Sequence, residues 1–297
     1  MFYSMYVGRF APSPTGPLHL GSLLAALASF LEARSRDGKW LLRIDDIDPP
    51  REQPGATQGI LATLSAHGFN WDGDVLLQST RCEAYRKTIK TLALNNLVYP
   101  CTCSRKKIKL RTSASHYDRF CLEYPPAHSA EAATRFLNHT SDVRWSDAIQ
   151  GPQLFSNTEV GDFILQRRDA LWAYHLAVTV DDNAQGITHV VRGFDLLAES
   201  AKQIALCSAL QIEPPAFTHI PVALSPSGQK LSKQNLAPAL DNSSASVNLI
   251  KALDLLGQQP EPSLVKSPPE EILAWATKHW QLDRVARAPD FGPAEET

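Results

Sequence analysis

The first hundred residues alternate between short apolar runs and longer segments in which apolar residues have a helical spacing. The runs at 1–11 and 38–48 predict strands, whereas residues 22–34, 55–68 and 82–97 predict helices. Alternation of this kind is typical of an α/β fold, in which crossover helices connect the strands of a parallel sheet.

The alternation stops between about Tyr99 and Val160, where cysteines, a basic run and mixed polar residues follow one another. We interpret this segment as an insertion. Regular structure resumes at 162–197, which predicts strands interrupted by turns, and a helix is expected at 199–210. Residues 219–234 predict a strand followed by a lysine-bearing loop.

Two helical segments, at 246–257 and 269–280, precede the C-terminal tail. The pattern therefore divides the chain into four parts. These are the first half of the sheet domain at 1–100, the insertion at 101–162, the second half of the sheet domain at 163–240, and a helical C-terminal region at 241–297.

Composition narrows the class of protein. The 297 residues are 43% hydrophobic and 20% charged, as in an ordinary soluble globular chain. The net charge of −2 lacks the basic excess typical of a dedicated nucleic-acid binder. No apolar run is long enough to span a bilayer, and the N-terminus lacks a signal-peptide pattern. We therefore expect a cytoplasmic enzyme with no membrane partner.

The turn between the first strand and the first helix, at residues 8–22, is rich in proline and glycine. Proline fixes φ, and glycine lets another group approach the backbone. Phosphate is a natural ligand here, because a helix N-terminus presents free N–H groups and a partial positive charge. Gly21 would admit an adenine base and His19 could donate to phosphate oxygens, although a histidine in such a turn is more often structural.

A second candidate feature lies about two hundred residues later, in the sequence GQKLSKQ at 228–234. Lys230 and Lys233 flank a Leu-Ser pair on a predicted loop. A basic loop is commonly no more than a solvated surface. Lysines on a loop can also stabilise the charge that develops on pyrophosphate in a transition state.

Three of the five cysteines are clustered, at Cys101, Cys103 and Cys121. In a chain without a secretion signal, clustering favours a metal site over disulfides. Structural zinc takes four ligands, and on chemistry alone His116 is a candidate for the fourth. The alternative is three unliganded thiols in a loop. The adjacent basic run at 105–111 is commonly a solvated face, but on an insertion it could contact RNA phosphates.

These features together resemble the class I aminoacyl-tRNA synthetases. HLGS at 19–22 and KLSKQ at 230–234 are similar to the HIGH and KMSKS signatures of that class, and RFAPSPTGPLHLG and RIDDIDPPRE resemble its glutamate branch. From about Tyr6 to about Leu240 the chain is most similar to the glutamyl-queuosine tRNA(Asp) synthetase family, in DIDPPRE, CTC, YDRFC, AVTVDD, VVRGFDLL and KLSKQN. The resemblance implies a Rossmann-like, doubly wound parallel sheet with a zinc-bearing insertion and a small helical C-terminal region.

The resemblance also implies roles for individual residues. Arg192 is the candidate for the substrate's side-chain carboxylate, because bidentate pairing with arginine distinguishes glutamate from glutamine. The implied catalytic residues are His19, Lys230 and Lys233. The implied glutamate-binding residues are Arg9, Ala11, Ser13, Asp45, Tyr174 and Arg192. The implied ATP-binding residues are Pro12, His19, Gly21, Ser22 and Lys233. The implied zinc ligands are Cys101, Cys103, Tyr117 and Cys121, with His116 as the alternative to Tyr117.

Two positions depart from the family pattern. Ser22 stands where the last HIGH position carries histidine, and its hydroxyl can still donate to a ribose or phosphate. Asp45 stands where the family usually carries glutamate, which is one methylene longer. The shorter side chain implies either a shifted substrate or a bridging water.

The resemblance implies an enzyme that uses ATP with Mg²⁺ to activate L-glutamate and that holds one Zn²⁺. About sixty residues follow KLSKQ, too few for a large anticodon-binding portion. The resemblance implies that the catalytic domain itself receives the anticodon loop of tRNA(Asp) and esterifies the cyclopentenediol of queuosine. One alternative is a truncated glutamyl-tRNA synthetase that charges the tRNA 3′ end. Another is a non-catalytic paralogue that binds ATP or tRNA. We expect a monomer.

Overall fold

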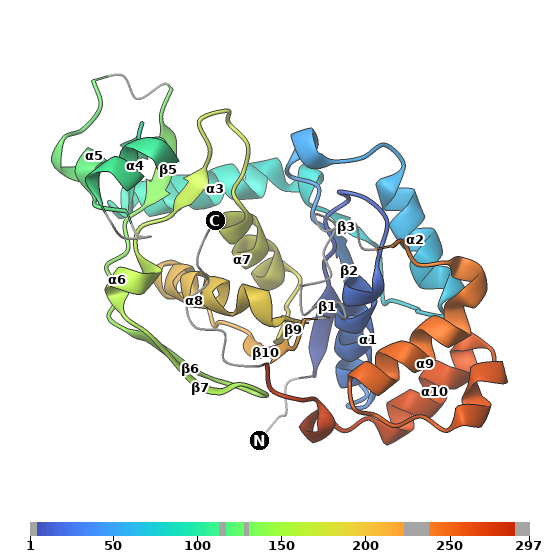
Figure 1. Ribbon diagram of the computed structural model, residues 1–297. Helices are drawn as coiled ribbons and strands as arrows, with labels where there is room; N and C mark the ends of the chain where they lie inside the picture. The colour runs from blue at the N-terminus through green and yellow to red at the C-terminus, as the bar shows by residue number, and fades with distance from the viewer. Residues whose placement is uncertain (1–4, 113–116, 128–130, 223–237, 289–297) are drawn as a thin grey trace.

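The computed structural model describes residues 5–112, 117–127, 131–222 and 238–288 (Figure 1). The strands are β1 (Val7–Phe10), β2 (Lys39–Ile44), β3 (Leu76–Leu77), β4 (Val98–Cys101), β5 (Ala133–Phe136), β6 (Val143–Asp147), β7 (Gly151–Phe155), β8 (Ile164–Gln166), β9 (His189–Gly193) and β10 (Ala216–Ile220). The helices are α1 (Leu20–Arg34), α2 (Ala56–Ala66), α3 (Cys82–Leu94), α4 (Arg105–Arg111), α5 (Phe120–Glu123), α6 (Asn157–Val160), α7 (Tyr174–Ala184), α8 (Leu197–Leu210), α9 (Ala245–Leu255) and α10 (Pro269–His279).

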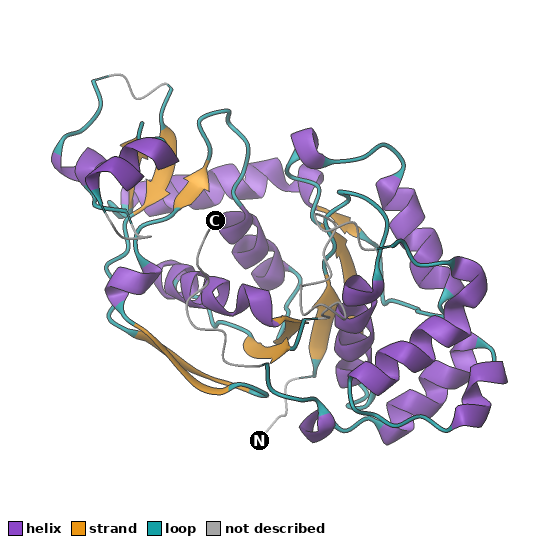
Figure 2. Ribbon diagram, viewed as in Figure 1, coloured by secondary structure: helices purple, strands orange, loops and turns teal. Residues whose placement is uncertain are grey.

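A parallel sheet forms the centre of the molecule. Strand β2 pairs in parallel with both β1 and β3, and β9 pairs in parallel with β10. The two pieces meet at β1, where the amide of Thr188 donates to the carbonyl of Val7 over 2.9 Å. Helices lie on both sides of these strands (Figure 2). The predicted α/β fold with a parallel sheet is confirmed.

Helix α1 anchors the main hydrophobic core. Its residues 23–33 are all buried except Ala25, because the Ala and Leu repeat leaves almost no polar face toward solvent. The buried Trp40 of β2 packs edge-on against Phe30 with ring centroids 5.2 Å apart, and its indole nitrogen donates to the Ser29 hydroxyl over 3.0 Å. Helices α9 and α10 pack against α1, so the predicted C-terminal helices complete this core.

The segment between the two halves of the sheet carries its own small sheets. Strands β4, β5 and β8 form an antiparallel sheet, and β6 pairs with β7 in a long hairpin. Helices α4 and α5 lie beside β5, at the opposite end of the molecule from α9 and α10 (Figure 1). The four-part division of the chain stays a prediction.

One predicted element is wrong. Residues 162–197 were expected to form strands interrupted by turns, and β8 and β9 are strands, but residues 174–184 between them form helix α7. Val178, Thr179 and Val180 favour strands when considered locally. Packing of α7 between α3 and α8 overrides that preference, because the helix buries Leu176 and Ala177 in a core that it shares with α3 and α8.

No helix in the described part of the chain is both long enough and apolar enough to cross a membrane.

Candidate functional site

The turn after β1 is held against the end of β2. The amide of Asp45 donates to the carbonyl of Pro12 and that of Gln53 to the carbonyl of Pro14, both over 3.0 Å. His19 is the N-cap of α1, and its Nδ1 accepts from the amide of Ser22 at 3.4 Å. Gly21 and Ser22 are therefore in the first helical turn, where the sequence predicted a phosphate site.

The segment that follows the predicted lysine loop returns to this turn. The amide of Leu240 donates to the carbonyl of Leu18 over 2.9 Å, and Ala239 forms a β-bridge with His19. Lys230 and Lys233 themselves lie outside the described residues, so their catalytic role stays a prediction.

A buried carboxylate, Asp182 in α7, holds two arginines from neighbouring strands. Its Oδ1 accepts from Arg9 Nε at 3.2 Å and from Arg43 Nη1 at 2.6 Å. Its Oδ2 accepts from the amide nitrogen of Gln203 at 2.9 Å. Arg43 also donates through Nε to Asp45 at 2.7 Å. The predicted glutamate-binding residues Arg9 and Asp45 are thus joined through Asp182 and Arg43.

Burial and charge act against each other in this network. Burial alone would raise the pKa of Asp182, but Arg9 and Arg43 lower it to about 2, so the carboxylate stays ionised. Burial raises the pKa of Asp45 in spite of the neighbouring Arg43. Burial would lower the pKa of Arg43, but its two carboxylate partners outweigh that effect and raise it. Asp182 and Arg43 therefore both stay charged within this buried network.

A second set of contacts fixes Arg192 of β9, which is only 5% exposed. Its Nη1 donates to the Tyr174 hydroxyl at 2.9 Å, its Nη2 to the Ser200 hydroxyl at 2.6 Å, and its Nε to His219 Nε2 at 3.2 Å. The structure therefore brings together Tyr174 and Arg192, the two residues expected to hold the amino acid.

His219 connects Arg192 to a further buried carboxylate. Its Nε2 accepts from Arg192, so its proton is on Nδ1, which donates to Asp147 at 2.6 Å. Burial lowers the pKa of His219, in spite of the attraction of Asp147, and this favours the neutral ring. A neutral His219 holds the guanidinium in place without adding a positive charge.

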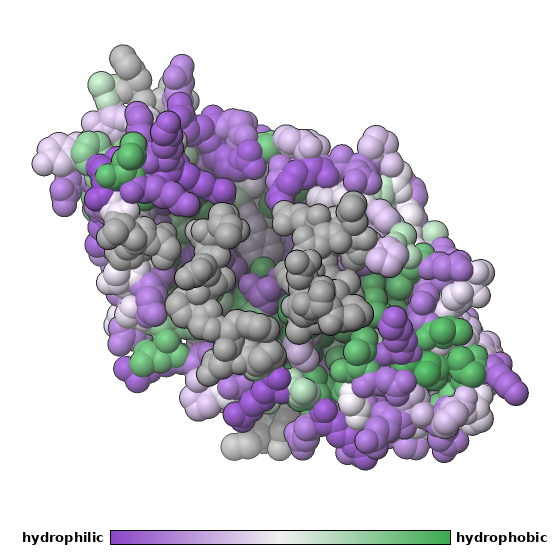
Figure 3. Space-filling view, viewed as in Figure 1, coloured by the Kyte–Doolittle hydropathy of each residue, from purple (hydrophilic) through white to green (hydrophobic). Residues whose placement is uncertain are grey.

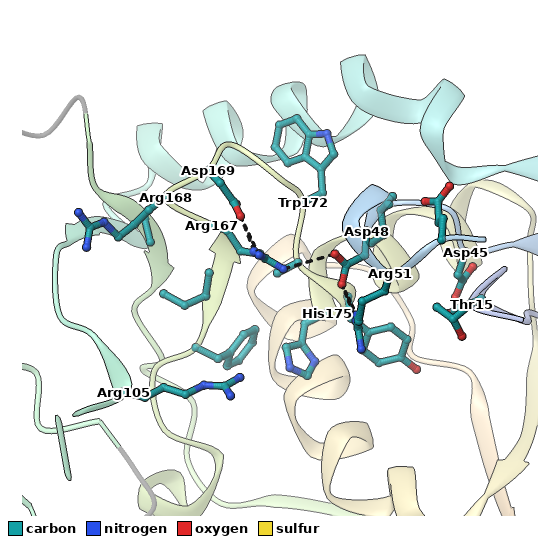
Figure 4. Close-up of a pocket in the computed structure, with 18 of the residues that line it drawn as sticks. Thr15, Asp45, Asp48, Arg51, Arg105, Arg167, Arg168, Asp169, Trp172 and His175 are labelled. Atoms are coloured by element: carbon teal, nitrogen blue, oxygen red, sulfur yellow. Dashed lines mark hydrogen bonds and ion pairs between the residues drawn. The ribbon is translucent and has the colours of Figure 1, made fainter. Parts of the chain in front are cut away.

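A cavity of about 1080 Å³ opens beside these networks (Figure 4). Of the predicted glutamate-binding residues, Ser13, Asp45 and Tyr174 line it. Arg9 and Arg192 are buried and, like Ala11, are not among the residues that line it. The cavity continues to Cys103 and Arg105, and so it extends from the strand ends to the inserted segment.

The three clustered cysteines lie together. The sulfurs of Cys101, Cys103 and Cys121 are all within 4.8 Å of one another. The hydroxyl of Tyr117 lies 3.4 Å from Cys101 Sγ and 3.7 Å from Cys103 Sγ. Thiolates around a tetrahedral zinc lie about 3.8 Å apart, given Zn–S bonds of about 2.3 Å, so the donor set fits zinc. The alternative ligand, His116, lies outside the described residues.

Several residues of these networks were not identified from the sequence as site residues: Arg43, Asp147, Asp182, Gln203 and His219. Arg43 and Asp182 fall within motifs that carried the resemblance, RIDDIDPPRE and AVTVDD, and their charge in apolar surroundings was an available signal. The other three come from segments with no local pattern that points to a site.

Comparisons with known proteins agree on one family. The model of the catalytic domain of class I tRNA synthetases (E and Q) matches residues 6–262. Two relatives, both called Glutamyl-Q tRNA(Asp) synthetase, are 46% identical to the chain. The one from Pseudomonas entomophila aligns over 286 residues and 96% of each chain. The one from Thiobacillus denitrificans aligns over 288 residues, 95% of this chain and 96% of its own.

Solved structures show the same fold. A glutamate tRNA ligase from Elizabethkingia meningosepticum, crystallised in complex with its amino acid, superposes with a TM-score of 0.77 at 24% identity. The match covers 95% of this chain and 66% of that longer one. A glutamate-tRNA synthetase from Elizabethkingia anophelis gives a TM-score of 0.78 at 23% identity, with coverage of 95% and 67%.

Proposed function

Because the chain belongs to the glutamyl-Q tRNA(Asp) synthetase family of class I tRNA synthetases, we propose that it activates L-glutamate with ATP and transfers it to queuosine in tRNA(Asp). The enzyme is a ligase of the class I synthetase type. The observation that carries the proposal is the pair of buried networks at the strand ends, which connect Arg192 to Tyr174 and Arg9 to Asp45, two residues that line the cavity.

Glutamate occupies the part of the cavity lined by Ser13, Asp45 and Tyr174. Arg192 takes the side-chain carboxylate, with the Tyr174 hydroxyl beside it, and Arg9 contacts the other carboxylate from beneath. Asp45 takes the α-amino group, directly or through a water. Ala11 shapes the pocket through the backbone of the turn. This arrangement discriminates against glutamine, because an amide offers one acceptor oxygen where a carboxylate offers two.

ATP binds as its Mg²⁺ complex at the turn and the start of α1, at Pro12, His19, Gly21 and Ser22. The α-carboxylate of glutamate attacks the α-phosphorus, and the bond to pyrophosphate breaks. Lys230 and Lys233 stabilise the charge that moves onto the leaving pyrophosphate. A hydroxyl of the queuosine cyclopentenediol then attacks the carbonyl carbon, and AMP leaves as the ester forms. Most of the rate enhancement comes from positioning and from charge stabilisation.

Zinc, held by Cys101, Cys103, Tyr117 and Cys121, is a structural cross-link of the inserted segment. Cys101 is the last residue of β4, Cys103 lies in the loop between β4 and α4, Tyr117 lies three residues before α5, and Cys121 is in α5. A metal there fixes α4 and α5 on the strands beneath. A cytoplasmic location and a monomeric state stay predictions.

The test is to identify the nucleoside that carries the glutamate. Queuosine-containing tRNA is incubated with the protein, labelled glutamate, ATP and Mg²⁺, digested to nucleosides, and examined by mass spectrometry. Glutamate on queuosine supports the proposal. Glutamate on the 3′-terminal adenosine would instead make this a synthetase that charges the 3′ end, and no labelled nucleoside would reject both functions.

A further inference from the structure

Two of the arginines that line the cavity, Arg105 and Arg168, lie on the same side of it (Figure 4). We propose that Arg105 and Arg168 bind backbone phosphates of the tRNA anticodon loop and so direct its base toward the glutamate site. This inference rests on the proposed function and deepens it. It assigns the RNA contact to two of the four arginines that line the cavity, which are Arg51, Arg105, Arg167 and Arg168.

The four arginines differ in how their charge is balanced. Arg51 pairs with Asp48 at 2.6 Å. Arg167 pairs with Asp169 at 2.7 Å and approaches Asp48 at 3.6 Å. These two guanidiniums are neutralised by carboxylates of the same wall, so they are poorly suited to attract a phosphate.

Arg105 and Arg168 have no such partner. Within the described ranges, no carboxylate lies within 4.0 Å of either side chain, and both are exposed. Arg168 donates through Nε to the backbone carbonyl of Glu131 at 3.1 Å, which orients the side chain without neutralising it. Unbalanced guanidiniums on a cleft wall are typical of phosphate recognition.

Their position fits an acceptor that enters from the inserted segment. Figure 4 shows Arg105 and Arg168 on one side of the view and Asp45 and Thr15 on the other, with Arg167 and Trp172 between them. The volume of about 1080 Å³ is at the upper limit of the range of about 300–1,000 Å³ that is usual for a small-molecule pocket. The cavity therefore extends from the residues proposed to bind glutamate to Arg105 and Arg168.

The surface of α4 beside Arg105 carries further positive charge. Lys106, Lys107 and Lys109 follow Arg105 on α4, and all three are exposed. Figure 3 shows hydrophilic side chains gathered over this part of the molecule. Arg111, the last residue of α4, is different, because it forms an ion pair with Asp118 at 2.6 Å. The predicted RNA-binding role of the basic run at 105–111 therefore applies to Arg105 and the lysines that follow it, and not to Arg111.

The test measures tRNA binding as a function of salt. The full-length parent, an R105Q/R168Q variant and an R86Q/R144Q variant are titrated with queuosine-containing tRNA(Asp) at several salt concentrations. Arg86 and Arg144 are controls for charge: their side chains are 63% and 70% exposed and neither lines the cavity, but each forms an ion pair, with Glu83 at 3.2 Å and with Asp142 at 3.5 Å. Both double variants lose the same net charge.

We expect R105Q/R168Q to raise the dissociation constant for tRNA about tenfold or more and to reduce the slope of log K against log salt by about 1.4, which is two single-strand phosphate contacts. R105K/R168K should restore most of the slope, since it keeps both charges. The inference would be overturned if R105Q/R168Q had the same salt slope as the parent. It would also be overturned if R86Q/R144Q lost as much tRNA affinity and slope as R105Q/R168Q. Failure of the parent to transfer glutamate to queuosine would instead reject the proposed function.

Discussion

The buried carboxylate of Asp182 offers a quantitative test of how the site is held together. In the folded protein this single group accepts hydrogen bonds from Arg9, Arg43 and Gln203. Replacing it with asparagine keeps the size and shape but removes the charge. Two guanidiniums, each less than 5% exposed, then face an amide in place of a carboxylate.

Two physical arguments give the loss in free energy of unfolding expected for Asp182→Asn. The pKa of Asp182 is lowered from 3.8 to about 2, so its ionised form contributes about 2 kcal/mol to the free energy of unfolding. Neutralising one partner of a buried ion pair costs more, about 3–5 kcal/mol, because the remaining charges stay buried without compensation. We therefore expect Asp182→Asn to lower the free energy of unfolding by about 3–5 kcal/mol at pH 7.

The assay is urea unfolding followed by circular dichroism. Asp169→Asn is the control, because Asp169 pairs with Arg167 at 2.7 Å but both side chains are almost half exposed, and such pairs contribute less than about 1 kcal/mol. In the parent the contribution of Asp182 is complete above pH 3.8 and is lost as the pH falls from 3.8 to about 2. A loss below about 1 kcal/mol for Asp182→Asn would refute this account of the network.

Three further predictions concern catalysis, the metal and pH. Lys233→Ala should lower glutamate-dependent ATP–pyrophosphate exchange about 10²-fold or more, and near-parental exchange would remove Lys233 from the transition state. The purified protein should contain one zinc per chain by elemental analysis. Cys103→Ser should lose it while Cys82→Ser keeps it, and a parent free of zinc would contradict the site. His175, the second residue of α7, has its Nε2 3.0 Å from a carboxylate oxygen of Glu199. Burial outweighs the attraction of Glu199 and lowers the pKa of His175 to about 4, and burial also lowers the pKa of His219. Because each pKa is depressed on folding, the unfolded chain binds more protons below pH 6.5. As the pH is lowered from 6.5 to the pKa of the folded state, each histidine should therefore reduce the free energy of unfolding by about 1.4 kcal/mol per pH unit. A urea midpoint that does not change between pH 7 and pH 5 would contradict this.

The main features of the fold could be predicted from the sequence because its local signals agree with the tertiary structure. The strand before the Pro- and Gly-rich turn and the helix after it are rich in apolar residues and are almost completely buried, and the two C-terminal helices have an apolar spacing that matches their buried residues. Helix α7 could not be predicted in this way. Its Val-Thr-Val run favours a strand locally, and only packing against α3 and α8, which the sequence does not reveal, makes it a helix.

The candidate site was predictable where a residue belongs to a contiguous motif. The turn with His19, the strand end with Asp45 and the Cys101–Cys103 pair are of this kind. The supporting groups were not predictable, because the fold brings them together from distant segments. Asp147 and His219, for example, are 72 residues apart and meet only because β6 packs against β10.

The proposed acceptor is queuosine, the modified anticodon base. The most direct test of this proposal is incorporation of labelled glutamate, with ATP and Mg²⁺, into two tRNA pools, one from cells that make queuosine and one from cells that cannot. If queuosine is the acceptor, only the first pool becomes labelled. Equal label in both pools would contradict the proposal and would make the protein a synthetase that charges the tRNA 3′ end.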